Sequence, residues 1–130
     1  MENTKLNQIL EEFNKKYRRK NILVAGGTGM VGMQLLNFLS NLDCTVSSAS
    51  LDNFLPKQKN VKHSRVDLRI PSNCEELLKD IDLVINVTGV AGSPKMAQEK
   101  PASFMSPNIL LPINILNAAA KNNVKEYLFT

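Results

Sequence analysis

The sequence is poor in the residues on which several classes of protein depend. Its 130 residues include two cysteines, one histidine and no tryptophan, and aromatic residues make up 5% of the chain. Two distant cysteines without a CxxC pair exclude a disulfide scaffold and are typical of reduced thiols in a cytoplasmic protein. The low aromatic content argues against a stacking platform for nucleic acid. No apolar run reaches the roughly 18 residues of a membrane span, so no membrane partner is expected.

The N-terminal segment, residues 1–20, is charged and lacks the apolar stretch of a signal peptide. Apolar residues recur in this segment at helical spacing, at Leu6, Ile9, Leu10, Phe13 and Tyr17. The spacing predicts an N-terminal amphipathic helix within residues 1–20.

Much of the positive charge lies in the same segment. The formal net charge is +4, and residues 1–20 hold six basic side chains against three acidic ones. A basic cluster beside a helix can bind nucleic acid, but no nucleic-acid motif accompanies this one. We interpret the cluster as a solvated face and a cationic helix end, and we expect no nucleic-acid partner.

Residues 21–130 alternate short apolar runs with helical patterns. Strands are predicted at 21–25, 45–49, 61–66, 82–87 and 126–130. Strands that alternate with helices at this spacing predict parallel βαβ units. Because such crossovers are right-handed, we expect an α/β fold with a doubly wound parallel sheet and helices on both faces.

Local signals predict how two of the helices begin and continue. Ser72 is placed to cap one helix, with Glu75 completing a capping box. Pro101 suits the first turn of a longer helix that continues to about residue 121. Pro107 and Pro112 lie inside that helix and predict a break or a kink.

The first predicted strand leads directly into a turn with the pattern G-x-x-G-x-x-G, formed by Gly26, Gly29 and Gly32. Gly26 permits the tight turn, Gly29 lets the backbone approach a pyrophosphate, and Gly32 lets the helix pack closely on the sheet. Free N–H groups at the helix start would face the phosphates. The strand–turn–helix context favours dinucleotide binding over a purely structural turn. No Gly-Lys-Ser/Thr follows, which argues against a P-loop, and the spacing is not the usual one of methyltransferases.

Residues 22–32, with the sequence ILVAGGTGMVG, resemble the N-terminus of the extended short-chain dehydrogenase/reductase family. This family comprises NAD(P)-dependent nucleotide-sugar epimerases, dehydratases and reductases, and the Gly-Met-Val-Gly ending is similar to its GDP-L-fucose synthase branch. The resemblance covers about residues 21–130 and continues through 66–69, 82–89, 101–119 and 124–130. It implies a Rossmann-type NAD(P)-binding domain over residues 21–130, incomplete because the sheet is truncated after about the fifth strand.

The resemblance also implies where NAD or NADP would bind. Candidates in the glycine turn and the helix after it are Gly26, Thr28, Gly29, Met30, Val31 and Gly32. Candidates that follow later strands or lie in the last helix are Ser50, Asp67, Leu68, Val87, Thr88, Gly89 and Asn108. By the same resemblance, Asp67 would approach the adenine and Asn108 would lie near the active site.

The end of the second strand distinguishes NAD from NADP. A carboxylate there binds the ribose 2′-OH of NAD, whereas a small polar residue or an arginine accommodates the phosphate of NADP. Counting from Gly32 places this position near Ser50, with Asp52 two residues later and no arginine nearby in the sequence. Ser50 at this position would allow NADP and Asp52 would favour NAD, so both cofactors stay open.

The catalytic residues of the family have no counterpart in the sequence. The family has a Ser or Thr just after the fifth strand and a Tyr-x-x-x-Lys on the next helix, where the Tyr acts as general acid and base. Tyr17 and Tyr127 are the two tyrosines, and neither is followed by Lys four residues on. We therefore assign no catalytic residue, and no metal ligand either, since His63 is interpreted as a surface residue.

Two functions follow as expectations. The first is the NAD(P)-binding part of a nucleotide-sugar epimerase, dehydratase or reductase, whose full-length parent would take a nucleotide sugar as substrate and could form a homodimer. The second is a non-catalytic NAD(P)-sensing or assembly module. Three explanations account for the missing catalytic residues. The chain is a fragment of a longer protein, which we favour, a chain trimmed from one, or a stand-alone module.

Overall fold

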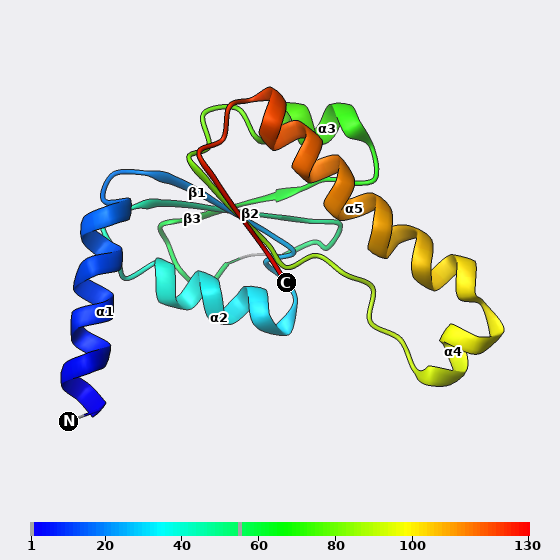
Figure 1. The fold of residues 1–130 in the computed structure, drawn as a ribbon, viewed down its shortest axis with the longest axis horizontal. Coiled ribbons are helices and arrows are strands. Elements are labelled where there is room, and N and C mark those ends of the chain that lie inside the picture. Colours follow the sequence, from blue (N-terminus) through cyan, green and yellow to red (C-terminus); the bar gives the residue numbers. More distant parts are fainter. Residues whose placement is uncertain (1, 55) are drawn as a thin grey trace.

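Five parallel strands form one sheet in the computed structural model, which describes residues 2–54 and 56–130 (Figure 1). The strands are β1 (Asn21–Ala25), β2 (Thr45–Ser50), β3 (Val61–Arg65), β4 (Leu83–Asn86) and β5 (Glu126–Phe129). Every strand expected from the sequence is confirmed within one or two residues at each end. The order in the sheet is β3-β2-β1-β4-β5.

Helices cover both faces of this sheet, which confirms the α/β doubly wound class. They are α1 (Glu2–Tyr17), α2 (Met30–Leu39), α3 (Pro71–Leu77), α4 (Pro94–Glu99) and α5 (Pro101–Lys121). α3 and α5 lie on one face, α2 lies on the other with α1 beside it, and α4 extends away from the sheet (Figure 1).

The chain changes direction across the sheet at β1. β1 pairs with β2 on one side and with β4 on the other, so that Ala25 lies opposite Ala49 and also opposite Asn86. The carboxyl ends of these three strands therefore meet at one edge. In open parallel sheets a crevice for a ligand forms outside this edge, at the point where the strand order reverses.

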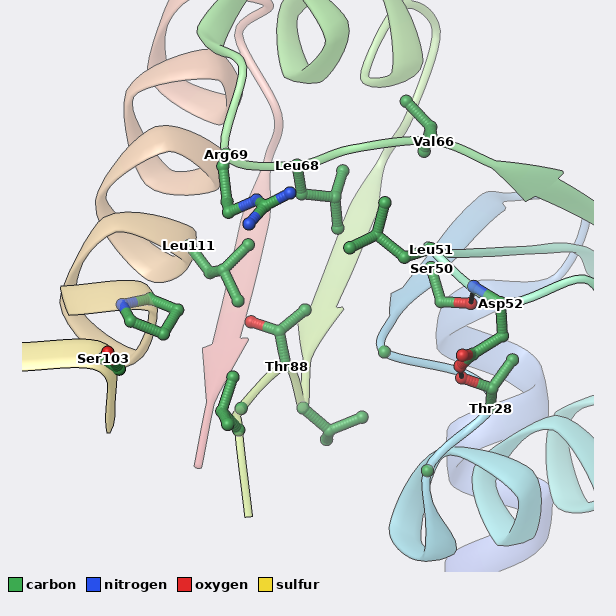
Figure 2. A pocket seen from close by; sticks show the side chains of 16 residues that line it. Thr28, Ser50, Leu51, Asp52, Val66, Leu68, Arg69, Thr88, Ser103 and Leu111 are labelled. Carbon is green, nitrogen blue, oxygen red and sulfur yellow. Dashed lines mark hydrogen bonds between the residues drawn. The ribbon is translucent and has the colours of Figure 1, made fainter. Parts of the chain in front are cut away.

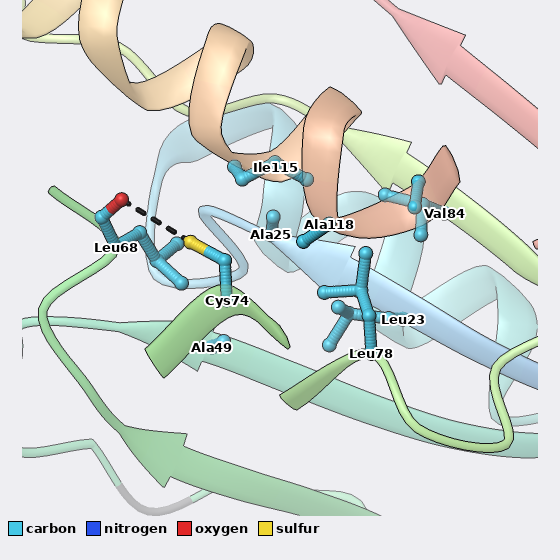
Figure 3. Close-up of a cluster of buried hydrophobic side chains, with 10 residues drawn as sticks. Leu23, Ala25, Ala49, Leu68, Cys74, Leu78, Val84, Ile115 and Ala118 are labelled. Carbon is cyan, nitrogen blue, oxygen red and sulfur yellow. Dashed lines mark hydrogen bonds between the residues drawn. The ribbon is translucent and has the colours of Figure 1, made fainter. Parts of the chain in front are cut away.

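Alternate residues of β1 belong to the two halves of the core. Leu23 and Ala25 pack with the cluster under α3 and α5, where Cys74 and Ile115 are also fully buried (Figure 3). Ile22 and Val24 pack on the opposite side, against α2 and the end of α1. Full burial of a side chain of this size contributes about 1.5–3 kcal/mol, so both helix layers are held by the hydrophobic effect.

The predicted N-terminal helix forms, but only its C-terminal end is packed. Tyr17 is buried, and Phe13 contacts both Tyr17 and Phe38 of α2. Leu6 and Ile9, on the same apolar stripe, are more than half exposed. The first half of α1 therefore stands clear of the sheet, as Figure 1 shows.

Three side chains of the basic cluster near residue 20 form ion pairs. Lys16 pairs with Glu126 at 2.7 Å, Arg18 with Asp43 at 2.8 Å, and Lys20 lies 3.9 Å from Asp82. The absence of a nucleic-acid partner stays a prediction.

The start of α3 differs from the prediction. The helix begins at Pro71, and its N-cap is Ile70, whose side chain makes no capping hydrogen bond. The predicted capping box from Ser72 to Glu75 is therefore wrong. Proline has its φ fixed near the helical value and has no N–H to satisfy, which makes it a strong first residue. Ser72 is thereby drawn into the first turn.

The two internal prolines do not break α5, which continues through Pro107 and Pro112 to Lys121. Each proline removes one helical hydrogen bond, but tertiary contacts hold the helix in place. Ile115 is fully buried, and Asn114 donates to the Arg69 carbonyl oxygen at 2.9 Å. Although α5 has 21 residues, none of the helices in the described ranges is long and apolar enough to cross a bilayer.

Candidate functional site

A cavity of about 460 Å³ opens at the carboxyl edge of the sheet, where β1, β2 and β4 end (Figure 2). Its walls come from the turn after β1, the end of β2, the segment after β3, the segment after β4, and one face of α5. The cavity therefore occupies the crevice that the strand order predicts for a ligand.

Two glycines of the turn after β1 are required by the fold itself. Gly26 has φ of +85°, a conformation that favours glycine, and a Cβ there would lie 2.8 Å from the Val87 carbonyl oxygen. A Cβ on Gly32 would lie 2.3 Å from the Gly26 carbonyl oxygen, because the first turn of α2 packs directly on the glycine turn. Both predicted structural roles are thus present.

Gly29 differs from these two glycines. It is the N-cap of α2 with extended backbone, and a Cβ there would meet only ordinary van der Waals contact, 3.4 Å from the Gly26 carbonyl oxygen. The protein itself therefore does not exclude a side chain at this position. Gly29 lines the cavity beside the free amides that begin α2, and those amides favour a negatively charged group.

The glycine turn and the end of β2 meet on one side of the cavity. The Thr28 hydroxyl donates to the Asp52 carboxylate, and the Asp52 amide donates to Ser50 Oγ at 3.1 Å. Figure 2 shows the three side chains grouped together on this side. Ser50 is the last residue of β2. Ser50 and Asp52, the two candidates for the position that distinguishes NAD from NADP, both line the cavity.

Two basic residues of β3 support the same corner. Arg65 Nε donates to the Leu51 carbonyl oxygen at 3.0 Å, so an arginine distant in the sequence lies close in space. His63 is partly buried rather than fully exposed, and its Nδ1 lies 3.1 Å from Ser48 Oγ. Its Nε2 lies 3.2 Å from the Asp52 carbonyl oxygen, so His63 braces the end of β2.

The segment after β3 places an ion pair at the rim. Arg69 Nη2 donates to Asp67 Oδ2 at 2.7 Å, and the Arg69 amide donates to Asp67 Oδ1 at 3.0 Å. Hydrogen bonds from Arg69 hold the pKa of the Asp67 carboxyl below its usual value. Arg69 and the buried Leu68 line the cavity, whereas the Asp67 carboxylate is turned toward Arg69.

The segment after β4 forms the floor of the cavity. Val87, Thr88 and Gly89 all line it. Asn108 does not line it but fixes this segment, since Asn108 Oδ1 accepts from the Val90 amide at 2.8 Å. Its Nδ2 donates to the Val90 carbonyl oxygen at 3.2 Å.

Most of the predicted cofactor-binding residues come together. Those that line the cavity are Gly26, Thr28, Gly29, Ser50, Leu68, Val87, Thr88 and Gly89. Those that do not are Met30, Val31, Gly32, Asp67 and Asn108. Met30 is 81% exposed and Val31 53% exposed, because both begin α2 on its solvent side. Any contact of these two with a ligand would come from their backbone amides, and it stays a prediction.

Several lining residues were not singled out from the sequence. They are Leu51, Val66, Arg69, Val90, Ser103, Pro107 and Leu111. A signal was present for three of them, because Ser103, Pro107 and Leu111 are spaced four apart and so share one face of a helix. Neither Tyr17 nor Tyr127 is among the lining residues of the cavity.

Comparison with known proteins gives the site a context. The model of the NAD dependent epimerase/dehydratase family matches residues 22–130. A protein named GDP-mannose 3,5-epimerase 1, from Oryza sativa subsp. indica, is 31% identical over 64 residues, which are 49% of this chain and 17% of that protein.

Solved structures share the fold. An epimerase from the methanogen Methanothermobacter thermautotrophicus aligns with a TM-score of 0.82 at 21% identity, over 93% of this chain and 37% of that one. A UDP-N-acetylglucosamine 4-epimerase from Methanobrevibacter ruminantium M1, in complex with UDP-N-acetylmuramic acid, aligns with a TM-score of 0.71 at 25% identity, over 85% of this chain and 37% of that one. The chain thus spans well under half the length of these relatives.

Proposed function

The chain belongs to the NAD-dependent epimerase/dehydratase family, and on that premise we propose that residues 21–130 are the NAD-binding part of a nucleotide-sugar epimerase, dehydratase or reductase. When bound, the nicotinamide of such a cofactor supplies reversible hydride exchange with a sugar carbon. The part played by this chain is to bind and orient the dinucleotide.

The proposal rests on the open space beside Gly29. Gly26 and Gly32 are required by the turn and by helix packing, but the fold leaves room for a side chain at Gly29. A glycine that the protein does not need is explained by a ligand that must approach the backbone there. The pyrophosphate of a dinucleotide, held by the first amides of α2, fits this position.

The end of β2 favours NAD over NADP within this proposal. Asp52 presents a carboxylate to the cavity, and such a group can accept hydrogen bonds from ribose hydroxyls. The additional phosphate of NADP would face the same negative charge. Arg65 is close to this corner but does not line the cavity, whereas Asp52 does. We therefore assign the discriminating role to Asp52 rather than to Ser50.

The proposal extends to the branch of the family, the substrate and the location. The Gly-Met-Val-Gly ending at residues 29–32 supports the GDP-L-fucose synthase branch, and a nucleotide sugar is proposed as the substrate of the whole protein. The free thiols of Cys44 and Cys74 support a cytoplasmic location.

A second function, as an assembly module, is favoured by the outer face of α5. Met105, Ile109, Ile113 and Leu116 follow one another along it, and each is about half exposed. An exposed apolar stripe on a helix is normally covered by another part of the protein or by a partner. We propose that a second copy of the chain covers it in a homodimer. Light scattering of Ile113→Glu tests this proposal, because a monomer is expected from the variant and a dimer from the wild type.

Calorimetric titration of the 130-residue chain with NAD and with NADP tests the principal proposal. NAD is expected to bind at least about tenfold more tightly than NADP, which corresponds to about 1.4 kcal/mol. Gly29→Leu should lose NAD binding while keeping the native circular dichroism spectrum, because its side chain would fill the phosphate position. If neither dinucleotide binds the wild-type chain, the proposal is wrong.

A further inference from the structure

One fully buried polar side chain has no place in the roles assigned so far. Asn86 ends β4, directly after the apolar residues Leu83, Val84 and Ile85, and is 0% exposed. Leaving a buried amide unpaired is unfavourable, so the partners of such a group reveal what it is arranged to do.

The partners of Asn86 fix the orientation of its amide. The Thr88 backbone amide, at 3.0 Å, is a donor only, so the atom that faces it must be the oxygen, Oδ1. On the other side, Nδ2 donates to the Tyr127 hydroxyl oxygen at 2.8 Å. The two ends of the amide therefore link the segment after β4 to the neighbouring strand β5.

The same oxygen of Asn86 also controls the Thr88 side chain. Thr88 Oγ1 donates to Asn86 Oδ1 at 2.7 Å. A hydroxyl has one hydrogen, so this bond leaves Oγ1 with lone pairs alone to offer to any other group. Thr88 lines the cavity, and Figure 2 shows its side chain projecting into it near Leu111.

The far side of the network gives the Nδ2 end of Asn86 a partner, whereas the Thr88 amide alone already fixes the direction of Oδ1. Because Tyr127 accepts from Asn86, its own hydroxyl hydrogen is directed elsewhere, to the Pro112 carbonyl oxygen of α5 at 3.4 Å. Burial raises the pKa of the Tyr127 hydroxyl, which keeps that hydrogen in place. The chain of bonds thus runs from α5 through β5 and β4 to the floor of the cavity.

We propose that Asn86 is a positioning residue that fixes Thr88 as a hydrogen-bond acceptor for a ribose hydroxyl of the bound dinucleotide. The inference rests on the proposed function and extends it to a residue outside the cavity wall. At this point of the floor the ligand must supply a donor, so a ligand group with only lone pairs is rejected.

A double-mutant cycle on the 130-residue chain tests the proposal, with NAD affinity measured by calorimetry and stability by urea unfolding. Thr88→Val is expected to weaken NAD binding about tenfold, while Thr88→Ser, which keeps the hydroxyl, stays within about threefold of wild type. Asn86→Ala should weaken binding about tenfold when Thr88 is present and have no further effect in the Thr88→Val background.

Tyr127→Phe is the matched control, because Tyr127 bonds Nδ2 of Asn86 and not the oxygen that Thr88 uses, and it does not line the cavity. It should lower stability while NAD affinity stays within about threefold of wild type. If Asn86→Ala does not fold, Asn86→Asp takes its place in the cycle. A carboxylate still accepts from Thr88, so the NAD affinity of Asn86→Asp should also stay within about threefold of wild type.

Three results would overturn the proposal. The first is equal weakening by Asn86→Ala in both backgrounds, or a tenfold loss in Asn86→Asp if that variant replaces it. The second is unchanged affinity in Thr88→Val. Both leave the proposed function standing, because the wild-type chain still binds NAD. The third is a wild-type chain that binds no NAD, which would overturn the inference together with the function.

Discussion

The Thr28 hydroxyl donates a hydrogen bond to the Asp52 carboxylate, which joins the glycine turn to the end of β2. The two residues are 24 positions apart in the sequence. Their bond sets the carboxylate on one side of the cavity before any ligand arrives. Preorganisation of this kind lowers the entropy that binding must otherwise overcome.

Replacing Asp52 with Asn should relax the choice between cofactors. Removing the negative charge weakens the bonds to ribose hydroxyls and ends the repulsion of the phosphate of NADP. We expect the preference for NAD to fall to about threefold or less in calorimetric titrations. Asp43→Asn is the control, since Asp43 pairs with Arg18 outside the cavity. A preference for NAD that is unchanged in Asp52→Asn would show that another residue discriminates.

Alanine at two glycines should separate ligand binding from folding. Gly32→Ala places a Cβ against the Gly26 carbonyl oxygen and should lower the free energy of unfolding by about 1–3 kcal/mol. Gly29→Ala should leave stability unchanged or raise it by up to about 1 kcal/mol, because its backbone is compatible with alanine. Its NAD affinity should fall about tenfold. Urea unfolding and calorimetry measure the two effects, and normal NAD affinity in Gly29→Ala would contradict the phosphate position.

Two adjacent residues of α5 should differ sharply when truncated. Ile115 lies on the face of α5 that packs on the sheet and is fully buried (Figure 3), so Ile115→Ala is expected to lower the free energy of unfolding by about 2–5 kcal/mol. Leu116 is 50% exposed in the single chain and lies on the proposed dimer face, so both changes are made in the monomeric Ile113→Glu variant, where Leu116→Ala should cost about 1 kcal/mol. Similar losses at Ile115 and Leu116 in urea unfolding of this variant would contradict their difference in burial.

The buried thiol of Cys74 should make stability fall at high pH. Burial raises the pKa of this thiol to about 11 from its ordinary value of 9.0. Between these values the unfolded chain loses the thiol proton while the folded chain keeps it, so unfolding is favoured as pH rises. The urea midpoint should therefore decline from about pH 9 to about pH 11.

Cys74→Ala isolates this contribution, because it removes the Cys74 thiol and leaves the other titrating groups in place. Cys44 and Tyr127, whose pKa values burial also raises, are present in both proteins. The decline above pH 9 should be shallower in Cys74→Ala than in wild type. Parallel curves for the two proteins would mean that Cys74 is not protonated in the folded state over this range.

The five strands could be predicted from local sequence patterns. β1 was predicted at residues 21–25, where it is found, because a short apolar run meets a glycine turn at its end. The short helix α4 was missed, although Ser93 caps it by accepting from the Met96 amide and Pro94 begins it. Six residues are too few for a helical period to stand out among turn residues.

Contacts between strands could not be predicted in the same way. Arg65 reaches Leu51 because β3 and β2 are in register, with Arg65 opposite Ser50. Asn86 looked like one polar residue at the end of an apolar run, and its partner Tyr127 lies 41 positions away. The sequence places neither pair together until the sheet order is known. The glycine pattern, in contrast, lies within one turn and could be interpreted locally.

The contact of α1 with β5 bears on the order in which the molecule is assembled. Glu126 accepts hydrogen bonds from Lys16 and Tyr17, which lie 110 and 109 positions earlier in the chain. During synthesis from the N-terminus, α1 leaves the ribosome before the sheet, and its acidic partner emerges more than one hundred residues later. Because contacts of such long range slow folding, the bonds of Lys16 and Tyr17 to Glu126 are among the last to form.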